Sequence, residues 1–599
     1  HILGKSLRLD NDVYRIIGVM PPGFRDQGRN IEERNTELWA AAGFAALPAP
    51  PPMRSSRLTL SSIARLQPGL TITAAQSRLD ALVASLKSKY PADYPPQGEW
   101  TLRLLPLSEF LVGNIRQSLI LLLGAVALVL LIGCANVANL LLARASARGR
   151  EIAVRQALGA DRTRILGQLL TESLLLSLLG GLAGIALLYC ARGLLLQLIP
   201  QTFPQLNDIS INFTVLAIAL LASVLAGLLF GLAPAWLTSR LDLTGTLRRE
   251  GLSSNGSPER TRMRRVLVIG ELALSLMLMI AAGLLLRSFW DLFRVQLGFN
   301  PSQVMTVQTW LPVPNEPKTD IYRTATQEAV LVREILRRTR TLPGVTQTAV
   351  GNLASLPLWH SRQDINFATL IRESTRESRE PSANQGPLID MAAVSPEYFS
   401  LLGIPLQCGR LFNDHDLENT PSVALINQAA AQVYWPNDNP IGKRFKLNAT
   451  KPWTTIIGVV ANAHTESLAD ASVPLIYFSV YQRTAKDLTI FLRGQVDPAT
   501  IPQQVRQQVQ SINAELPVFR DQTLDNIVAG SLSARKFSME MIALFAATAL
   551  LLAAIGIYGT ISYLVSEQTR EFGIRIALGA QRERILKSVL RQGLGLAIR

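Results

Sequence analysis

Five stretches of the chain are almost entirely apolar, and polar residues recur in the segments between them. A helix that crosses the hydrocarbon core of a membrane needs about 20 mostly apolar residues. Four of the stretches contain no charged residue, and the remaining one contains a single acid, Glu271. The pattern therefore predicts five transmembrane helices. They are residues 117–143, 173–191, 209–239, 266–286 and 541–566.

The composition agrees with a membrane protein. The chain has 599 residues, of which 48% are hydrophobic and only 17% charged, whereas about 25% of residues are charged in an ordinary soluble domain. The net charge of +15 does not indicate nucleic-acid binding, because many Arg residues flank the apolar stretches and none forms a basic stripe with aromatic residues. No nucleic-acid partner is therefore expected.

Arginine placement predicts the orientation. Six Arg residues lie between the first two apolar stretches, whereas Arg192 is the only basic residue between the second and the third. Short cytoplasmic loops collect Lys and Arg, so the first of these loops is expected in the cytoplasm. By alternation, residues 1–116 and about 287–540 lie on the outer side.

The large outer segment has the pattern of a mixed α/β domain. Residues 304–311 alternate like a strand, and residues 324–340 form an amphipathic helix. Its apolar face is predicted to consist of Ala329, Val330, Val332, Ile335 and Leu336. Residues 394–416 and 422–430 together predict helix, turn, strand and helix.

Two cytoplasmic segments repeat one another at a spacing of 420 residues. Residues 150–170 read REIAVRQALGADRTRILGQLL and residues 570–590 read REFGIRIALGAQRERILKSVL, which is identity at 12 of 21 positions. Four predicted crossings separate the copies. Since that number is even, both copies face the cytoplasm and the repeat is parallel.

A second repeat relates the outer segments. Gly4, Lys5 and a strand at 14–20 correspond to Gly442, Lys443 and a strand at 455–460. Residues 58–70 with a helix through Lys89 correspond in the same way to residues 488–500 with a helix through Leu516. The chain is therefore expected to begin within one copy of the outer domain and to lack the first membrane helix of that copy and about two helices of the other.

The repeated cytoplasmic segment is amphipathic and is interrupted at Gly159, a residue that commonly ends a helix. An isolated helix of this kind can simply stabilise the bundle at the membrane surface. Its duplication favours a docking surface, and two equal surfaces imply a partner with two-fold symmetry.

Motifs for catalysis are missing or incomplete. Gly4-Lys5-Ser6 has only the tail of a phosphate-binding loop, and its partner in the repeat lacks the final Ser, so a turn into a strand is favoured. The four His residues have no metal-ligand spacing. An intramembrane acid such as Glu271 is a functional candidate, but a proton relay would require partners at mid-depth, and the sequence shows none. Glu271, about six residues inside its helix, is therefore expected to snorkel, to pair with Arg265 or to pack between helices.

The layout of a helix, a large outer domain and three further helices, with R-E-x-x-x-R-x-A-L-G-A after the second helix, resembles the MacB/FtsX family of ABC-transporter permeases. The phrases SPEYFSLLGIPL, GRLF, NPIGKRFKL and IIGVV resemble the MacB-like periplasmic core domain. Since both halves occur in one chain, it is similar to the duplicated orphan permeases of Acidobacteria.

The resemblance implies an α-helical membrane protein with mixed α+β periplasmic domains, built from two parallel FtsX-like repeats that each have four transmembrane helices when complete. The domains expected are 1–116, the C-terminal part of a first periplasmic core domain; 117–239, three transmembrane helices with the cytoplasmic coupling helix 144–170; 240–265, a cytoplasmic linker; 266–286, a transmembrane helix; 287–540, a second core domain; and 541–599, with a transmembrane helix at 541–566 and a coupling helix at 567–590.

In that family the helix after the second crossing contacts the ATPase. The resemblance implies contacts through Glu151, Arg155, Ala157, Leu158, Gly159, Ala160, Glu571, Arg575, Ala577, Leu578, Gly579 and Ala580. The partner expected is an ABC ATPase dimer at the cytoplasmic face. A periplasmic adaptor or outer partner and membrane lipid are expected as well. No cofactor or metal is expected in this chain, because ATP is used by the partner.

Three functions stay open on the sequence alone. The first is an inner-membrane permease that drives export, and the second is a mechanical signalling module that regulates a periplasmic partner without transport. The third, an ion-coupled secondary transporter, would require broken helices, for which only Asn136, Asn139 and Pro234 give a hint.

Overall fold

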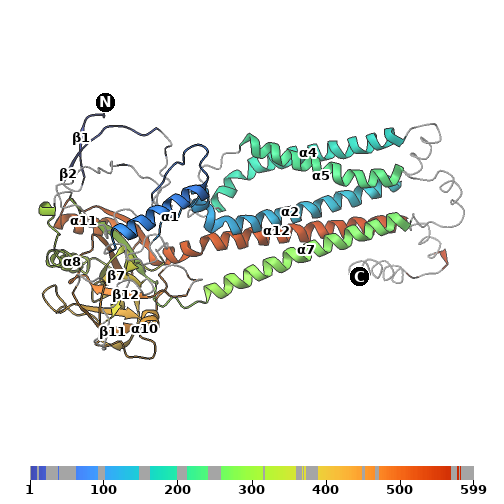
Figure 1. Cartoon of the computed structure of the whole chain (residues 1–599). Coiled ribbons are helices and arrows are strands. Elements are labelled where there is room, and N and C mark those ends of the chain that lie inside the picture. The colour runs from blue at the N-terminus through green and yellow to red at the C-terminus, as the bar shows by residue number, and fades with distance from the viewer. Residues whose placement is uncertain are drawn as a thin grey trace. The chain divides into compact units, whose positions relative to one another are not determined.

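The computed structural model describes residues 2–9, 12–21, 24, 38–39, 62–91, 101–147, 162–198, 212–239, 258–314, 317–358, 367–368, 370–372, 389–447, 452–465, 468, 471–567, 577–578 and 581. The chain forms two compact units. The outer unit is His1–Leu111 with Leu292–Ser533, and the bundle unit is Val112–Asp291 with Ala534–Arg599. Figure 1 shows their elements along the chain.

Five long helices account for the bundle unit. They are α2 (Leu107–Ala147), α4 (Arg162–Leu198), α5 (Phe213–Ser239), α7 (Pro258–Phe293) and α12 (Leu524–Glu567). Four of them are long and apolar enough to cross a membrane, over Arg116–Leu142, Leu166–Gly193, Arg265–Phe293 and Arg535–Gly559. These four predicted crossings are confirmed. In α5 the apolar helix found among the described residues, Phe213–Leu228, is shorter, so the fifth crossing stays a prediction.

Helices α2, α7 and α12 lie side by side (Figure 1) around a shared apolar core. The buried members of that core are Ala125, Ile132, Leu278, Ile542 and Ala549. Helix α4 packs against α5, and their backbones approach closely at Gly227, where a Cβ would overlap the Ser177 hydroxyl. Both α2 and α5 continue through the residues that hinted at broken helices, Asn136, Asn139 and Pro234.

The helices extend well beyond the apolar stretches. The predicted domain boundaries after residues 116, 265, 286 and 540 all fall inside helices, and Pro258 and Glu259 of the expected linker are helical. Charged residues mark where a helix leaves the membrane, but Arg and Lys are good helix formers. The helix therefore continues past them.

The outer unit contains a sheet of 12 strands in the order β14-β3-β13-β4-β7-β12-β9-β11-β10-β6, with β5 beside β7 and β8 beside β11. Its strands are β3 (Val304–Trp310), β4 (Val345–Asn352), β5 (Phe367–Ala368), β6 (Ile371–Arg372), β7 (Ile389–Val394), β8 (Leu406–Gly409), β9 (Val423–Asn427), β10 (Arg444–Lys446), β11 (Thr454–Val460), β12 (Leu475–Ser479), β13 (Asp487–Gly494) and β14 (Val518–Thr523). Strand β11 runs parallel to β9, and β12 runs parallel to β7, whereas the other pairs are antiparallel. The prediction of a mixed sheet is confirmed.

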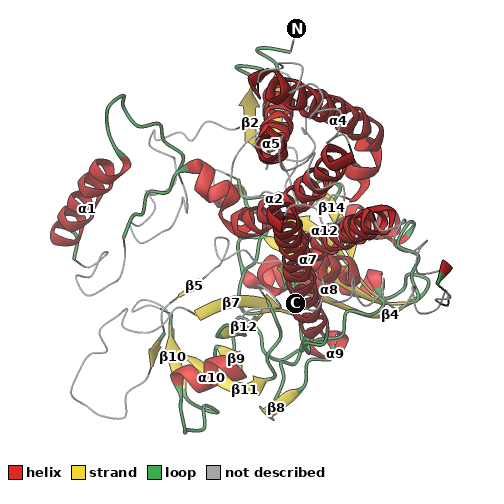
Figure 2. Ribbon diagram, turned by 90° about the vertical axis from the view of Figure 1, so that its right-hand side faces the viewer, coloured by secondary structure: helices red, strands yellow, loops and turns green. Residues whose placement is uncertain are grey.

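Helices cover both faces of the first part of this sheet. Helices α8 (Ala325–Thr339) and α11 (Ile501–Ile512) share one apolar core with β3, β4 and β13. On the other face the short helix α9 (Tyr398–Leu402) places Tyr398 against Phe491 of β13. Figure 2 shows α10 (Gln428–Tyr434) beside β9 and β11 in the second part of the sheet.

Three details of the outer domain differ between the prediction and the structure. Helix α8 begins after Thr324, whose side chain and that of Gln327 form a capping box, as its polar start suggests. However, Val330 is 64% exposed and does not belong to the apolar face, which Leu331 joins instead. Strand β3 is buried along nearly its whole length, because helices α8 and α11 cover one face of the sheet and other elements cover the opposite face. The alternation of its residues therefore does not separate a buried side from an exposed side. Residues 394–430 also contain two strands, β8 and β9, where one was predicted.

The N-terminal hairpin repeats a hairpin of the sheet. Strands β1 (Ser6–Leu9) and β2 (Asp12–Arg15) pair antiparallel. The N–H of Gly4 donates to Ile16 O at 2.9 Å, and the N–H of Gly442 donates to Ile456 O at 2.8 Å. Both glycines have a left-handed φ, +84° and +79°. The predicted correspondence of these turns is confirmed, and Gly4-Lys5-Ser6 enters a strand.

The predicted helix after this hairpin is α1 (Ile72–Lys89), which Thr71 caps at its N-terminus. The predicted strand at 14–20 is shorter, because regular pairing of β2 ends at Arg15.

Candidate functional site

Most of the predicted ATPase-docking residues lie outside the described residues. These are Glu151, Arg155, Ala157, Leu158, Gly159, Ala160, Glu571, Arg575, Gly579 and Ala580. Of the whole set, Ala577 and Leu578 are described, and both are exposed. The Leu578 side chain is 82% exposed, so an apolar group of the segment remains available for a partner.

The end of the first cytoplasmic segment belongs to a membrane helix. Helix α4 begins at Arg162 and continues through the span Leu166–Gly193. Residues 162–170, predicted as part of a separate coupling helix, are therefore continuous with the second crossing. A force applied to this part of the segment would act directly on α4.

The outer sheet connects to the membrane helices through two neighbouring strands. Helix α7 leads into β3, and β14 leads at Leu524 directly into α12. Strands β3 and β14 pair antiparallel, with Val518 opposite Thr309 and Thr523 opposite Met305. The Thr306 hydroxyl also donates to Gln522 O at 2.9 Å. The chain thus enters and leaves this sheet through one hydrogen-bonded strand pair.

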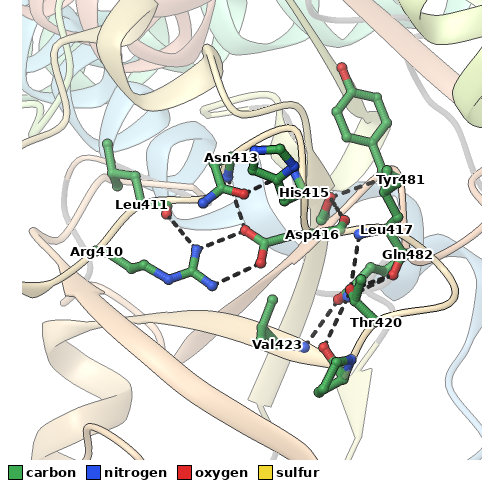
Figure 3. A network of polar contacts seen from close by, with 12 residues as sticks. Arg410, Leu411, Asn413, His415, Asp416, Leu417, Thr420, Val423, Tyr481 and Gln482 are labelled. Atoms are coloured by element: carbon green, nitrogen blue, oxygen red, sulfur yellow. Dashed lines mark hydrogen bonds and ion pairs between the residues drawn. The ribbon is translucent and has the colours of Figure 1, made fainter.

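An ion pair fixes the loop that carries the GRLF phrase (Figure 3). The Arg410 guanidinium donates to both carboxylate oxygens of Asp416, each at 2.8 Å, and the N–H of Asn413 donates to Asp416 Oδ2 at 2.9 Å. Burial alone would raise the pKa of Asp416, but these hydrogen bonds outweigh it and lower that pKa. Because the Asp416 side chain is only 8% exposed, its charge depends on Arg410.

Gln482 joins the end of this loop to the sheet (Figure 3). Its Nε2 donates to Leu417 O and to the Thr420 hydroxyl, each at 3.0 Å, and its Oε1 accepts from the N–H of Val423. One amide side chain therefore satisfies backbone groups on both sides of the turn into β9. This network explains why the loop can be irregular without leaving polar groups unpaired.

Two glycines of the family-like phrases face one another across β8 and β11. Gly409 pairs with Gly458, and a Cβ at Gly409 would lie 2.7 Å from Gly458 Cα. A Cβ at Gly458 would lie 2.5 Å from Arg410 O. The GR of GRLF and the G of IIGVV therefore form one close backbone contact.

The SPEYF phrase supplies an aromatic cluster under the sheet. Tyr398 and Phe399 are both buried and contact Tyr477, and the Tyr398 hydroxyl donates to Ser355 O. The Ser395 hydroxyl accepts from the N–H of Val350 at 3.1 Å. These residues position α9 and do not form an open catalytic site.

A buried acid lies at the start of α8. Glu328 is 1% exposed; its Oε2 accepts from the N–H of Ala485 at 2.7 Å, and its Oε1 lies 3.6 Å from Lys486 Nζ. Lys486 also pairs with Asp320 at 2.9 Å. Burial raises the pKa of Glu328 to about 7, although the Ala485 N–H and Lys486 act in the opposite direction.

Glu271 is buried inside the bundle. Its side chain is 1% exposed, whereas Arg265 is exposed. Neither carboxylate oxygen has a hydrogen-bond partner among the described residues. The predictions that Glu271 snorkels or pairs with Arg265 are wrong, and the expectation that it packs between helices is confirmed. Its neighbours could not be predicted from the sequence, because they lie on other helices.

Two family models match the chain. The FtsX-like permease C-terminal model matches residues 123–243 and 543–598, and the MacB-like periplasmic core domain model matches residues 266–512. Together they account for most of the bundle and the outer sheet. The chain belongs to the MacB/FtsX family of ABC permeases.

Several curated members of the family are similar over part of their length. The pyoverdine export ATP-binding/permease protein PvdT of Pseudomonas aeruginosa is 39% identical over 22% of this chain and 19% of its own length. The macrolide export ATP-binding/permease protein MacB of Aggregatibacter actinomycetemcomitans is 29% identical over 37% of each chain. The permease YknZ of Bacillus subtilis is 36% identical over 23% of this chain and 34% of its own. The matches thus span at most 37% of the length of these three relatives.

Solved structures of periplasmic and extracellular domains are also similar. The match to the periplasmic region of MacB from Actinobacillus actinomycetemcomitans covers 40% of this chain and 96% of the MacB structure, with 14% sequence identity and a TM-score of 0.26. The match to the extracellular domain of YknZ covers 36% of this chain and 100% of the YknZ structure, with 12% sequence identity and a TM-score of 0.24.

Family membership and the four apolar helices make the chain a multi-pass protein of the inner membrane.

Proposed function

We propose that the chain is the permease subunit of an ABC-type system in which separate ATPase subunits drive a conformational change of the periplasmic domain. The observation that carries this proposal is the attachment of α7 and α12 to the paired strands β3 and β14. A relative shift of the two helices would act on one strand pair and hence on the whole sheet.

The cytoplasmic end of the proposal rests on the repeated segments. Glu151, Arg155 and residues 157–160, with their copies Glu571, Arg575 and residues 577–580, form the docking surface for an ATPase dimer. The identity of the two segments at 12 of 21 positions, at a spacing of 420 residues, supports this assignment. The continuity of residues 162–170 with α4 supports transmission into the bundle.

Export is the favoured outcome of this motion. The relatives PvdT and MacB are named as pyoverdine and macrolide export proteins. An adaptor or outer partner on the periplasmic side, and contact with lipid, complete the proposal.

The test is charge reversal at the docking surface. The full-length protein would be purified with its ATPase and reconstituted in nanodiscs, and ATPase binding and stimulated hydrolysis would be measured. We expect the double variant Glu151→Lys and Glu571→Lys to lose both. Glu109→Lys, at the outer start of α2, is the matched control and should retain both. Unchanged binding and stimulation in the double variant would refute the docking assignment.

A further inference from the structure

A polar cluster lies inside the core that α2, α7 and α12 share. Glu271 of α7 is 1% exposed, and Asn136 and Asn139 of α2 are each 6% exposed. The cluster adjoins the apolar core around Ile132 and Leu278. Ionisable and amide side chains are costly in such surroundings unless they have partners.

The cluster faces a glycine of the third helix. A Cβ at Gly556 of α12 would lie 2.6 Å from each carboxylate oxygen of Glu271 and would overlap Asn136 Oδ1. The three oxygens therefore converge on one point of the α12 surface. Any larger residue at position 556 would displace them.

The Glu271 carboxylate lies near the Asn136 amide, but the buried acceptors of the cluster are not satisfied in this arrangement. Asn136 Nδ2 donates to Leu552 O of α12 at 2.8 Å. Asn136 Oδ1 and both Glu271 oxygens are buried acceptors without a partner among the described residues, and the amide of Asn139 is also unpartnered. An ionised carboxylate in this position would be unfavourable, because no cation among the described residues compensates it.

The neighbouring elements supply no such cation. Within the described spans of α2, α7 and α12, the titratable side chains besides Glu271 and the terminal arginines are Cys134, Arg287, Asp291, Lys536, Glu540 and Tyr558. Tyr558 is 74% exposed and Cys134 is buried. The basic residues Arg116, Arg265 and Arg535 begin the spans, and Arg287 and Lys536 lie near Asp291 and Glu540 on their own helices.

We propose that Glu271 binds a proton inside the bundle and that its hydroxyl donates to Asn136 Oδ1. One proton removes the unpaired charge and supplies the missing donor for the amide oxygen. The neutral pair then joins α7 to α2, while Asn136 Nδ2 joins α2 to α12. Release of the proton would leave a buried charge and break the link between α7 and α2.

The contact relates equivalent positions of the two repeats. The spacing of 420 residues that connects the cytoplasmic copies also connects Asn136 with Gly556 and Asn139 with Gly559. The first repeat thus carries amides where the second carries glycines. The proposed proton site is built at a junction between the repeats.

Isotope-edited infrared spectroscopy of the full chain in lipid nanodiscs tests the proposal. The spectrum of Glu271→Gln would be subtracted from that of the wild type at pH 7.5. We expect the difference to contain the C=O band of a protonated carboxyl group, and we expect that band to shift to higher frequency in Asn136→Ala, where the acceptor is removed. The second variant keeps Glu271 itself, so it remains informative if Glu271→Gln does not fold.

Glu334→Gln, which removes a carboxylate whose pKa Arg337 and Arg338 hold at about 2, is the control and should remove only ionised carboxylate bands. Ionised bands alone for Glu271 at pH 7.5 would overturn the proposal. A Glu271 band that changes when sodium replaces choline would overturn it as well, because the oxygens would then hold a metal cation.

Discussion

The carboxylate of Glu328 lies between a backbone N–H, that of Ala485, and the ammonium of Lys486. This placement holds the start of α8 against the loop before β13. The acid is nevertheless buried so well that its pKa rises to about 7. The outer unit therefore contains a group whose charge changes near neutral pH.

We expect the outer unit to lose stability as the pH rises from about 4.5 to 7. The folded pKa of Glu328 exceeds its ordinary value of 4.5, so the protonated form favours the folded state, and this contribution is complete below 4.5 and lost through 7. By linkage the change is on the order of 3 kcal/mol. Thermal unfolding of the full chain in detergent should show the decline, and Glu328→Gln should remove it.

Glu334→Gln on the same helix is the control. Hydrogen bonds from Arg337 and Arg338 lower the pKa of Glu334 to about 2, so its contribution is lost only as the pH falls toward 2. This variant should keep the decline between 4.5 and 7. The same decline in Glu328→Gln would contradict the assignment.

Removing the Arg410 side chain should destabilise the loop of Figure 3. Arg410→Ala leaves the Asp416 carboxylate, only 8% exposed, without its two hydrogen bonds from the guanidinium. We expect a loss of about 1–3 kcal/mol in the free energy of unfolding. Arg410→Lys should recover part of it, since Lys retains the charge but not the two-point geometry. Arg340→Ala, which breaks the more exposed pair with Glu397, should cost less than 1 kcal/mol. Equal losses for Arg410→Ala and Arg340→Ala would be inconsistent with this reasoning.

Gly556→Ala should weaken the bundle. Its Cβ would overlap Asn136 Oδ1 and approach both Glu271 oxygens at 2.6 Å, and overpacking of this kind costs about 1–3 kcal/mol. Gly559→Ala is a matched control one turn along α12, because its Cβ would lie 3.6 Å from Leu140 Cδ2, an ordinary contact. The melting temperature of the chain in nanodiscs should fall in the first variant only. A similar fall in both would show that position 556 is not special.

Interrupting helix α12 should uncouple ATP hydrolysis by the partner from the conformational change of the outer unit. Ser531 is an exposed residue in the interior of this helix, and proline there would remove a backbone hydrogen bond and kink the helix at a cost of about 3 kcal/mol. We expect Ser531→Pro to retain ATPase binding but to lose the nucleotide-dependent change in distance between spin labels in the outer unit. Ser531→Ala should behave as the wild type. A full response in Ser531→Pro would show that α12 does not transmit the motion.

Much of this architecture can be predicted from local patterns. Uncharged stretches identify the membrane helices, Thr324 and Gln327 mark the start of α8, and the matching turns at Gly4 and Gly442 can be recognised from their sequences alone. Such features depend on neighbours along the chain. Helices α2 and α12 run through the boundaries predicted after residues 116 and 540, because hydropathy reports contact with lipid and not the length of the helix.

Features that depend on distant segments cannot be predicted in this way. Val330 has an apolar side chain but lies on the exposed side of α8, and only the orientation of α8 on the sheet decides that. The contact of Gly409 with Gly458 requires the pairing of β8 with β11. Glu271 likewise shows its neighbours only once three helices are packed together.

The junction at Asn136 and Gly556 has an evolutionary consequence. In a homodimer, one gene sets both sides of a symmetric interface, so an amide would meet an identical amide and every mutation would occur twice. A single polypeptide with two copies can change one side while the other stays constant. A bulky polar residue such as Asn136 could thus arise in one half, and the glycine that accommodates it, Gly556, in the other. The complementary shapes of the two residues would then favour correct pairing of the two halves.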